Sequence, residues 1–352
     1  MAKGKRLKRV LLSLLVVLVL VAASIGGITY SWTYTPHGRL DYTAAIISKL
    51  ASWSTEPLEI SPQAREASRE MDSMVSSSDA LAEGVRSEDR MIPRPDGSLL
   101  PIRIYWPESP EPLPLYLDIH GGGWWMGDGY PLHVANSHFA KRAGVILVSV
   151  EYRLVPEYVF PAQLDDSSTA LAWMQANAAT IGGDPDRLAV GGGSAGGNLA
   201  AALAIRTRDE GGPKISFQFL FVPATDICGS RHWPSFDEMG DDYMLKVSGV
   251  HDMIAAYVPD PAMRTLPTAS PLLAADHAGL PPALVVTAQF DPLRDQGEAY
   301  AHALKAAGVP VTLHRENGSI HGFVGSPDRM NRIYDMGADA VHKALLIEED
   351  AP

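Results

Sequence analysis

Cysteine is nearly absent from this sequence. Cys228 is the only one among 352 residues, so neither an intramolecular disulfide nor a cysteine-rich metal site can form. No set of histidine, aspartate and glutamate residues has the spacing of metal ligands, and neither a phosphate-binding loop nor a dinucleotide fingerprint occurs. The sequence therefore predicts no metal site and no nucleotide cofactor.

Positive charge is scarce once the first ten residues are set aside. The remainder has 24 basic against 41 acidic residues, a net charge of about −17. A body of this charge offers no electrostatic attraction for nucleic acid or for anionic lipid. We therefore expect no nucleic-acid partner. We see no internal repeat and no low-complexity linker after the N-terminal segment.

Basic residues are concentrated at the N-terminus, where they precede a long apolar run from Val10 to Ile28. About 19 residues at 1.5 Å per residue just span a bilayer core. We favour a retained membrane anchor over residues 1–28, although Ala22-Ala23-Ser24 leaves open a cleaved signal peptide and a secreted product. In either case the positive residues place the N-terminus in the cytoplasm and the remaining chain outside it. These residues are Lys3, Lys5, Arg6, Lys8 and Arg9.

The organisation of the chain changes near residue 100. Residues 29–100 have helix-like stretches at 42–53 and 62–82, which we interpret as a connector and the N-terminal part of a lid. From residue 102 onward apolar strands alternate with helices, which indicates an α/β fold with a mostly parallel sheet covered on both faces. We predict a catalytic domain over 101–352 with a lid insertion at 226–282. The predicted strands are 102–106, 113–119, 145–152, 187–190, 217–222, 283–287 and 309–316.

One stretch has the pattern G-x-S-x-G, with Ser194 at its centre and Gly192 and Gly196 on either side. An apolar strand precedes it, and an Ala/Leu-rich helix follows it. A strand, a tight turn and a helix are the context in which such a serine is exposed above a sheet. The alternative is a glycine-rich loop that only packs a helix against the sheet.

A serine nucleophile needs an oriented base. His321 follows the last predicted strand in a glycine-bounded loop, whereas His314 lies within that strand and is expected to be structural. Asp291 closes another strand and is the candidate acid. Asp295 is its local competitor, and either aspartate could instead cap a helix. The order Ser194, Asp291, His321 is that of a hydrolase triad.

A glycine run, Gly121-Gly122-Gly123, follows the strand that ends before His120. Consecutive glycines let backbone N–H groups turn toward an anion with no Cβ in the way. We expect His120 to shape this loop. Trp124 and Trp125 could line a substrate pocket or pack in the core.

With these motifs the chain resembles the hormone-sensitive-lipase-type family of α/β-hydrolase esterases. The resemblance implies an eight-stranded sheet, a lid built from the N-terminal region and an insertion, and ester hydrolysis without a cofactor. It also implies oxyanion donors at the N–H groups of Gly122, Gly123 and Ala195. Gly193 departs from the pattern, since members usually have Asp or Thr before the nucleophile. The matching segments are 120–124, 152–157, 193–198, 291–295 and 320–323.

We therefore predict a serine carboxylesterase that acts on small-molecule or lipid esters, with short to medium acyl chains. The alternatives are an amide or ester deacetylase, a lipid hydrolase at the membrane, and a non-catalytic ligand-binding protein of the same fold. The anchor resembles that of the membrane-tethered deacetylase branch. Arg153 and Glu157 are expected to form a structural ion pair. The sequence predicts no oligomeric state.

Overall fold

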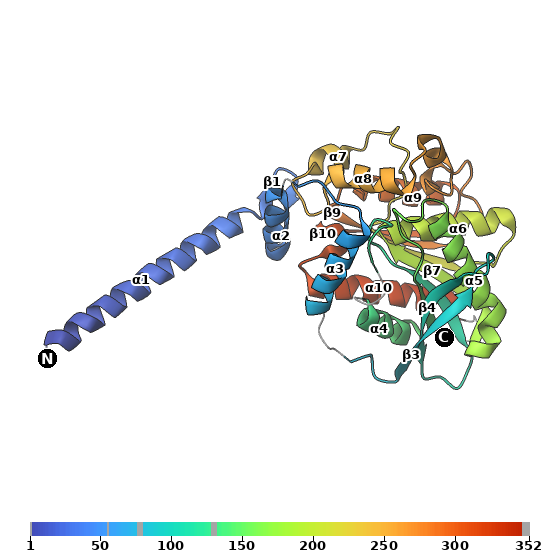
Figure 1. Cartoon of the computed structure of the whole chain (residues 1–352), viewed down its shortest axis with the longest axis horizontal. Helices are drawn as coiled ribbons and strands as arrows, with labels where there is room; N and C mark the ends of the chain where they lie inside the picture. The colour runs from blue at the N-terminus through green and yellow to red at the C-terminus, as the bar shows by residue number, and fades with distance from the viewer. Residues whose placement is uncertain (1, 55, 76–79, 128–131, 347–352) are drawn as a thin grey trace.

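An eight-stranded sheet forms the centre of the computed structural model, which describes residues 2–54, 56–75, 80–127 and 132–346 (Figure 1). The strand order is β10-β9-β8-β7-β5-β6-β4-β3. Neighbours are parallel from β10 to β6, and β4 and β3 pair antiparallel at one edge. The predicted mostly parallel sheet is thus confirmed. The strands are β3 (Val85–Pro93), β4 (Leu99–Pro107), β5 (Leu113–Ile119), β6 (Ile146–Val150), β7 (Gly183–Gly193), β8 (Phe217–Phe221), β9 (Ala283–Phe290) and β10 (Val311–Ile320).

Helices cover both faces of this sheet. In β5, Leu115 and Leu117 belong to the core cluster that contains residues of α5 (Ala162–Ile181), α6 (Ala195–Glu210) and α9 (Arg294–Ala306). Between them, Tyr116 belongs to the cluster on the other face, with residues of α4 (His133–Ala143) and α10 (Pro327–Leu345). Side chains alternate between the faces of a strand, so a strand buried on both sides is apolar at most of its positions.

The sheet begins earlier in the chain than the sequence predicts. β3 lies within residues 29–100, which we assigned to a connector and lid, yet it pairs with β4 along its whole length. Its sequence includes the charged run Glu88-Asp89-Arg90. An edge strand has one solvated side, and charged residues there prevent further pairing. The strand therefore lacks the apolar signal that marks the buried strands.

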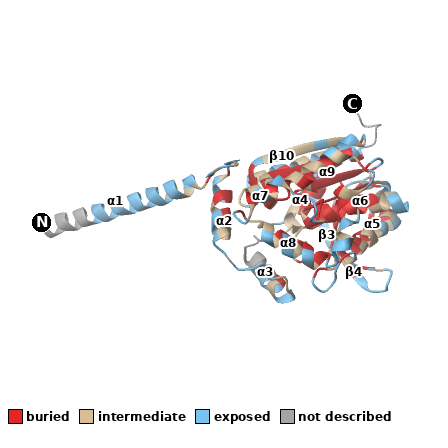
Figure 2. Ribbon diagram, turned by 90° about the horizontal axis from the view of Figure 1, so that it is seen from above, coloured by how far each residue is buried: buried red, intermediate tan, exposed pale blue. Residues whose placement is uncertain are grey.

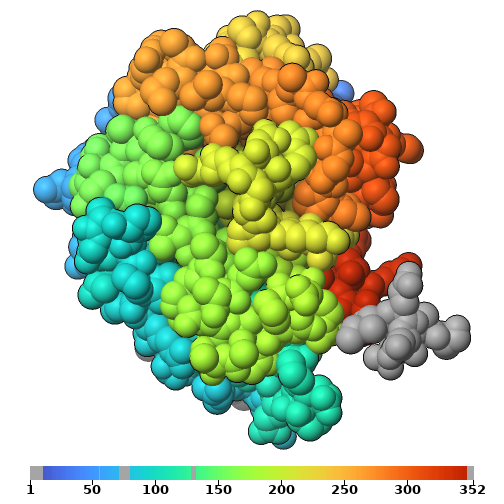
Figure 3. Space-filling view, turned by 90° about the vertical axis from the view of Figure 1, so that its right-hand side faces the viewer, coloured from blue at the N-terminus to red at the C-terminus, as the bar shows by residue number. Residues whose placement is uncertain are grey.

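The insertion lies over the end of the sheet where the parallel strands terminate. It contains α7 (Pro234–Met239), α8 (Val247–Tyr257) and two short 3₁₀ turns, Pro261–Thr265 and Pro271–Leu273. In Figure 3 the gold and orange insertion covers the upper end of the molecule. The N-terminal region adds the small hairpin β1 (Tyr34–Thr35) and β2 (Gly38–Arg39), then α2 (Tyr42–Trp53) and α3 (Pro62–Val75). The helix predicted over 42–53 is therefore present, whereas the stretch predicted over 62–82 is helical only to Val75, since residues 80–82 are not helical and 76–79 lie outside the described residues.

α1 (Ala2–Ser31) projects away from this body (Figures 1 and 2). Its segment Leu11–Ser31 is long and apolar enough to cross a membrane, and none of the apolar window is buried. A signal sequence would have the same properties.

Candidate active site

The turn around Ser194 joins β7 to α6 and holds the serine in a strained conformation, with φ 55° and ψ −117°. Its two flanking glycines lie against the end of β5. A Cβ on Gly192 would meet the Ile119 carbonyl oxygen at 2.3 Å, and one on Gly196 would meet it at 1.9 Å. Only glycine fits at either position, so the turn is pressed against the strand that leads into the glycine run.

Three side chains from different strand ends meet at this turn. His321 Nε2 lies 2.9 Å from Ser194 Oγ, and His321 Nδ1 lies 2.8 Å from Asp291 Oδ2. Asp291 is fully buried, and its Oδ1 accepts a hydrogen bond from the Leu293 N–H at 2.9 Å. A carboxylate acceptor requires Nδ1 to carry the proton. Nε2 is then left free to accept the serine proton.

The glycine run lies directly beside the serine. A Cβ on Gly121 would meet the Gly193 carbonyl oxygen at 2.9 Å and Ser194 Cβ at 3.6 Å. Gly122 and Gly123 both have positive φ, 104° and 59°. Between described residues, no backbone hydrogen bond occupies their N–H groups. These groups can therefore serve as anion donors near the reacting atoms.

His120 shapes this loop, as its position predicts. Its Nδ1 lies 2.7 Å from the Gly121 carbonyl oxygen, and its ring stacks on Tyr152 with centroids 4.1 Å apart. The Tyr152 hydroxyl in turn donates to the His120 carbonyl at 2.9 Å. The ring is thus held away from the triad.

A residue of the insertion contacts the glycine run. Met253 of α8 lies over Gly123, where an added Cβ would be 2.0 Å from its Sδ. Trp124 stacks on Tyr257 at the end of α8, with centroids 4.3 Å apart and planes 7° apart. Trp124 and Trp125 are both buried in the main core cluster. This placement favours the packing alternative, and contact of either ring with substrate stays a prediction.

Comparison with known proteins agrees with this geometry. A family model described as the alpha/beta hydrolase fold matches residues 116–325, more than half of the chain. The chain belongs to the α/β-hydrolase family. Within that family it is of the hormone-sensitive-lipase type.

Several relatives of this α/β-hydrolase are named as esterases. A carboxylesterase of Mycobacterium tuberculosis is 45% identical over 246 residues, which cover 68% of this chain and 76% of the relative. An arylesterase of Saccharolobus solfataricus is 39% identical over 231 residues, covering 65% and 74%. The solved structure of a Pyrobaculum calidifontis esterase has a TM-score of 0.77 at 34% identity, covering 86% of this chain and 97% of that one.

The other aspartate and histidine that the sequence analysis considered for the triad have partners elsewhere in the hydrolase. Asp295 accepts a hydrogen bond from Arg294 Nε at 2.8 Å and another from the Ser235 N–H of the insertion at 2.8 Å. Both of its carboxylate oxygens therefore have partners outside the triad. His314 lies in β10 and pairs with Glu316 at 2.8 Å, as expected of a structural residue. Within the described ranges, no group of three or more His, Cys, Asp or Glu side chains could hold a metal ion.

The predicted ion pair between Arg153 and Glu157 is wrong. Arg153 binds Asp166, with Nη2 and Oδ1 2.9 Å apart, and Glu157 binds Arg65, with Nη2 and Oε2 2.7 Å apart. Residues four apart pair readily on a helix, but this segment is not helical. The two side chains are therefore free to take partners from α5 and α3.

Arg65 is the residue that the sequence analysis missed. From α3 its Nε donates to the Trp125 carbonyl at 2.7 Å, and its Nη2 donates to the Val155 carbonyl at 2.6 Å. Glu157 neutralises the charge of this guanidinium. Arg65 thus ties the N-terminal region to the loop that follows the glycine run. Arg65 lies in a polar helix, 60 residues before Trp125. Its neighbours in the sequence do not distinguish it from a solvent-exposed arginine.

We expect Arg65→Ala to lower kcat roughly 10- to 100-fold, because small displacements of catalytic groups have effects of this size. Arg65→Lys, which keeps the charge but cannot donate to both carbonyls, should recover only part of the loss. Steady-state rates on a soluble ester well below the melting temperature test this. Arg90→Ala is the control and should be unaffected, because Arg90 is a partly exposed arginine of β3 that pairs with Glu88. Unchanged kcat in Arg65→Ala would refute the positioning role.

Gly193 has a structural explanation in Phe221. The two residues are paired on β7 and β8, and a Cβ on Gly193 would meet the Phe221 ring at 2.2 Å. The ring fills the space that a side chain before the nucleophile would need. Gly193→Asp should therefore destabilise the hydrolase by about 1–3 kcal/mol through overpacking. Adding Phe221→Ala should restore part of the lost melting temperature, and no such recovery would contradict this explanation.

Asp118, two residues before His120, is a buried carboxyl that the triad does not use. Asn136 Nδ2 donates to it at 3.0 Å and the Ser149 hydroxyl at 3.3 Å. Burial outweighs these hydrogen bonds and raises the pKa of Asp118 to about 6. Because this pKa lies above that of an unfolded aspartate, the folded state loses stability as pH rises through about 6.

Asp118→Asn cannot ionise, so we expect it to melt higher than the parent at pH 7.5 and close to the parent at pH 4.5. A shift of about two pKa units corresponds to on the order of 3 kcal/mol at the higher pH. Thermal unfolding at both pH values measures the difference. An equal effect of the substitution at the two pH values would show that ionisation of Asp118 has no part in stability.

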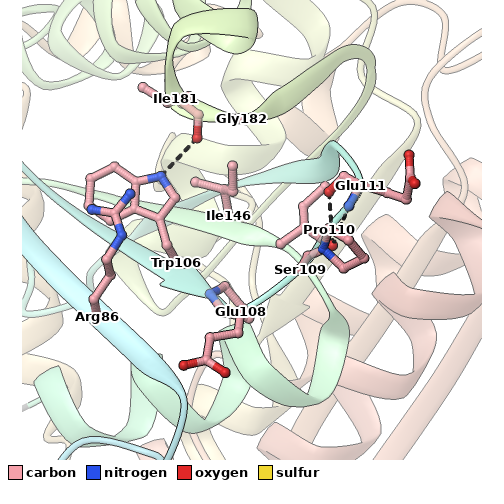
Figure 4. Close-up of a pocket in the computed structure, with 11 residues that line it drawn as sticks. Arg86, Trp106, Glu108, Ser109, Pro110, Glu111, Ile146, Ile181 and Gly182 are labelled. Atoms are coloured by element: carbon pink, nitrogen blue, oxygen red, sulfur yellow. Dashed lines mark hydrogen bonds between the residues drawn. The ribbon is translucent and has the colours of Figure 1, made fainter.

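A hollow at the opposite end of the sheet is separate from this site (Figure 4). There the Arg86 guanidinium lies 3.7 Å from the Trp106 ring centroid, and Trp106 Nε1 donates to the Ile181 carbonyl at 2.9 Å. These contacts close the bottom of the sheet, and no residue of the triad lines the hollow.

Proposed function

We propose that Ser194, His321 and Asp291 carry out the ester hydrolysis of this chain, which is a carboxylic ester hydrolase. The observation that carries the assignment is the continuous pair of hydrogen bonds from Asp291 through His321 to Ser194. A non-catalytic protein of the same fold would have no need to keep all three groups aligned. Serine hydrolases of this kind act through an acyl-enzyme intermediate.

In the proposed first step Ser194 Oγ attacks the ester carbonyl carbon while His321 Nε2 takes its proton. Asp291 holds the imidazole in the required tautomer and stabilises the imidazolium. His321 then returns the proton to the departing alcohol, which leaves Ser194 acylated. In the second half, water loses a proton to Nε2, attacks the acyl carbon, and the carboxylic acid leaves as Ser194 regains its proton.

The oxyanion of each tetrahedral intermediate is proposed to bind the N–H groups of Gly122, Gly123 and Ala195. Ala195 is the first residue of α6, so its N–H lies at the end of the helix that favours negative charge. Donors fixed before the reaction lower the barrier because they need no reorganisation, and one such donor contributes about 2.7–4 kcal/mol.

The proposed substrates are esters with short to medium acyl chains. The support is likeness to the relatives, whose names are carboxylesterase and arylesterase. Rates of the full chain on p-nitrophenyl esters from acetate to palmitate, with an acetanilide in parallel, test this. A maximum between two and about eight carbons supports the proposal. A maximum at the longest chains would instead identify a lipid hydrolase, and faster anilide cleavage a deacetylase.

We further propose that residues 1–28 are a retained anchor, with the N-terminus in the cytoplasm and residues 29–352 outside it. The exposed apolar segment of α1 and the basic residues before it support this. Intact mass of the membrane fraction after an alkaline carbonate wash tests the anchor. A mature product that begins after residue 22 would show that the segment is a cleaved signal.

A further inference from the structure

α2 is apolar on two faces, although only one of them packs against the body. Its inner face contributes Ala44 and Ala45 to a buried cluster with Phe290 and Ile320. These two partners immediately precede Asp291 and His321 in the chain. α2 therefore lies one layer away from the residues that position the acid and the base.

The outer face of α2 is exposed and also apolar. Tyr42, Ile46, Leu50 and Trp53 are spaced by four, four and three residues, which places them on one side of a helix. Tyr42 is 46% exposed, Leu50 54% and Trp53 61%. α2 contains no acidic residue, and Lys49 is its only charged one. A contiguous apolar stripe of this kind on a body that is otherwise strongly acidic marks an interaction surface.

The position of α2 next to α1 indicates which partner covers this apolar stripe. Figures 1 and 2 show α2 at the end of the body from which α1 projects. The two helices are joined by a hydrogen bond between the Thr29 and Tyr42 hydroxyls at 2.6 Å, and the Trp32 and Trp53 rings meet edge to face at 6.2 Å. The surface of α2 is thus continuous with the apolar surface of α1.

The junction has the composition of a membrane–water boundary. The Arg39 guanidinium lies 5.2 Å from the centroids of both Tyr30 and Tyr34, just beyond the apolar segment. Aromatic and basic side chains gather at the level of the lipid head groups, where an apolar ring and a polar tip are both accommodated.

We propose that α2 lies in the interface of the bilayer that α1 spans, with Tyr42, Ile46, Leu50 and Trp53 in contact with lipid. An amphipathic helix in this position buries its apolar face at the boundary between head groups and acyl chains. The contact needs no anionic lipid, in agreement with the charge of the body. The triad is then held at least one helix diameter, roughly 10 Å, from the lipid. This inference rests on the proposed retention of α1.

Because Cys228 is the only cysteine, its replacement allows one fluorescent label to be attached at a chosen position, and the contact with lipid can be measured there. In a Cys228→Ser background, Leu50→Cys and Trp53→Cys would each be labelled with a bimane fluorophore and the full chain placed in phosphatidylcholine nanodiscs. We expect brominated acyl chains to quench both labels at least threefold more than a label at Leu99→Cys. Leu99 is 53% exposed and begins β4, which is next to the edge strand on the side of the sheet opposite β10 and α2.

Equal quenching at positions 50, 53 and 99 in chains that stay with the nanodiscs would overturn the proposal. Shielding from aqueous iodide without lipid quenching would overturn it too, because a second copy of the chain would then cover the stripe. Loss of the chain from the nanodiscs would overturn both the anchor and the α2 contact. Hydrolysis of p-nitrophenyl butyrate by the same samples is measured separately, so active enzyme with unquenched labels leaves the proposed function intact.

Discussion

Ser194→Ala is expected to lower kcat on a soluble p-nitrophenyl ester by roughly 10⁴- to 10⁶-fold, with little change in KM. The substitution removes the only atom that can form the acyl-enzyme, whereas the glycine run and the surrounding core are left in place. Ser194 is 2.9 Å from His321 Nε2 and makes no other side-chain hydrogen bond to the described residues. Folding should therefore be preserved, which a thermal melt of the same sample checks.

Ser167→Ala is the matched control. Ser167 is buried in α5 and donates to the Gln163 carbonyl of its own helix at 2.9 Å. We expect its kcat to stay within about twofold of the parent, because it contacts no reacting group. Full activity in Ser194→Ala would show that another residue is the nucleophile.

Asp291→Asn is expected to lower kcat by roughly 10³- to 10⁴-fold while the fold is retained. Asparagine fits the same space, but its amide nitrogen donates where the carboxylate accepted. His321 would then protonate Nε2 instead of Nδ1 and could not take the proton of Ser194. Single-turnover acylation, followed by release of p-nitrophenol, locates the loss in the chemical step.

Asp295→Asn distinguishes the two aspartates of this segment. Asp295 holds the Arg294 guanidinium and the Ser235 N–H, and neither of these groups forms a hydrogen bond with a triad side chain. Its replacement should cost stability of the insertion and change kcat by less than about fivefold. A larger loss in Asp295→Asn than in Asp291→Asn would mean that the acid is misassigned.

Local sequence was sufficient for residues whose role follows from the backbone around them. Gly121, Gly122, Gly192 and Gly196 are glycines because a Cβ there would collide with neighbouring backbone, and a Cβ on Gly123 would collide with the Met253 side chain. Such requirements are visible as short motifs. Asp291 and His321 could be proposed because each follows a predicted strand, and parallel strands end at the same edge of a sheet.

Pairings between polar side chains could not be predicted in the same way. Arg153 forms an ion pair with Asp166, and Glu157 forms one with Arg65. The residues of the second pair are 92 positions apart in the sequence. A guanidinium accepts any carboxylate within reach, so its partner is set by the packing of helices. β3 was missed for a related reason, since a solvent-exposed edge strand does not need the regular alternation of apolar residues by which a strand is recognised.

The sequence by itself determined the residues proposed as nucleophile, base and acid, the glycine run proposed to bind the oxyanion, and the apolar N-terminal segment, because each depends on residue type and on order along the chain. Only the tertiary structure decided that α3 fastens the loop after the glycine run through Arg65. It alone placed Phe221 in the space beside Gly193 and left one face of α2 uncovered next to α1. These features depend on which surfaces meet when the elements pack, and distance in space is not encoded in distance along the chain.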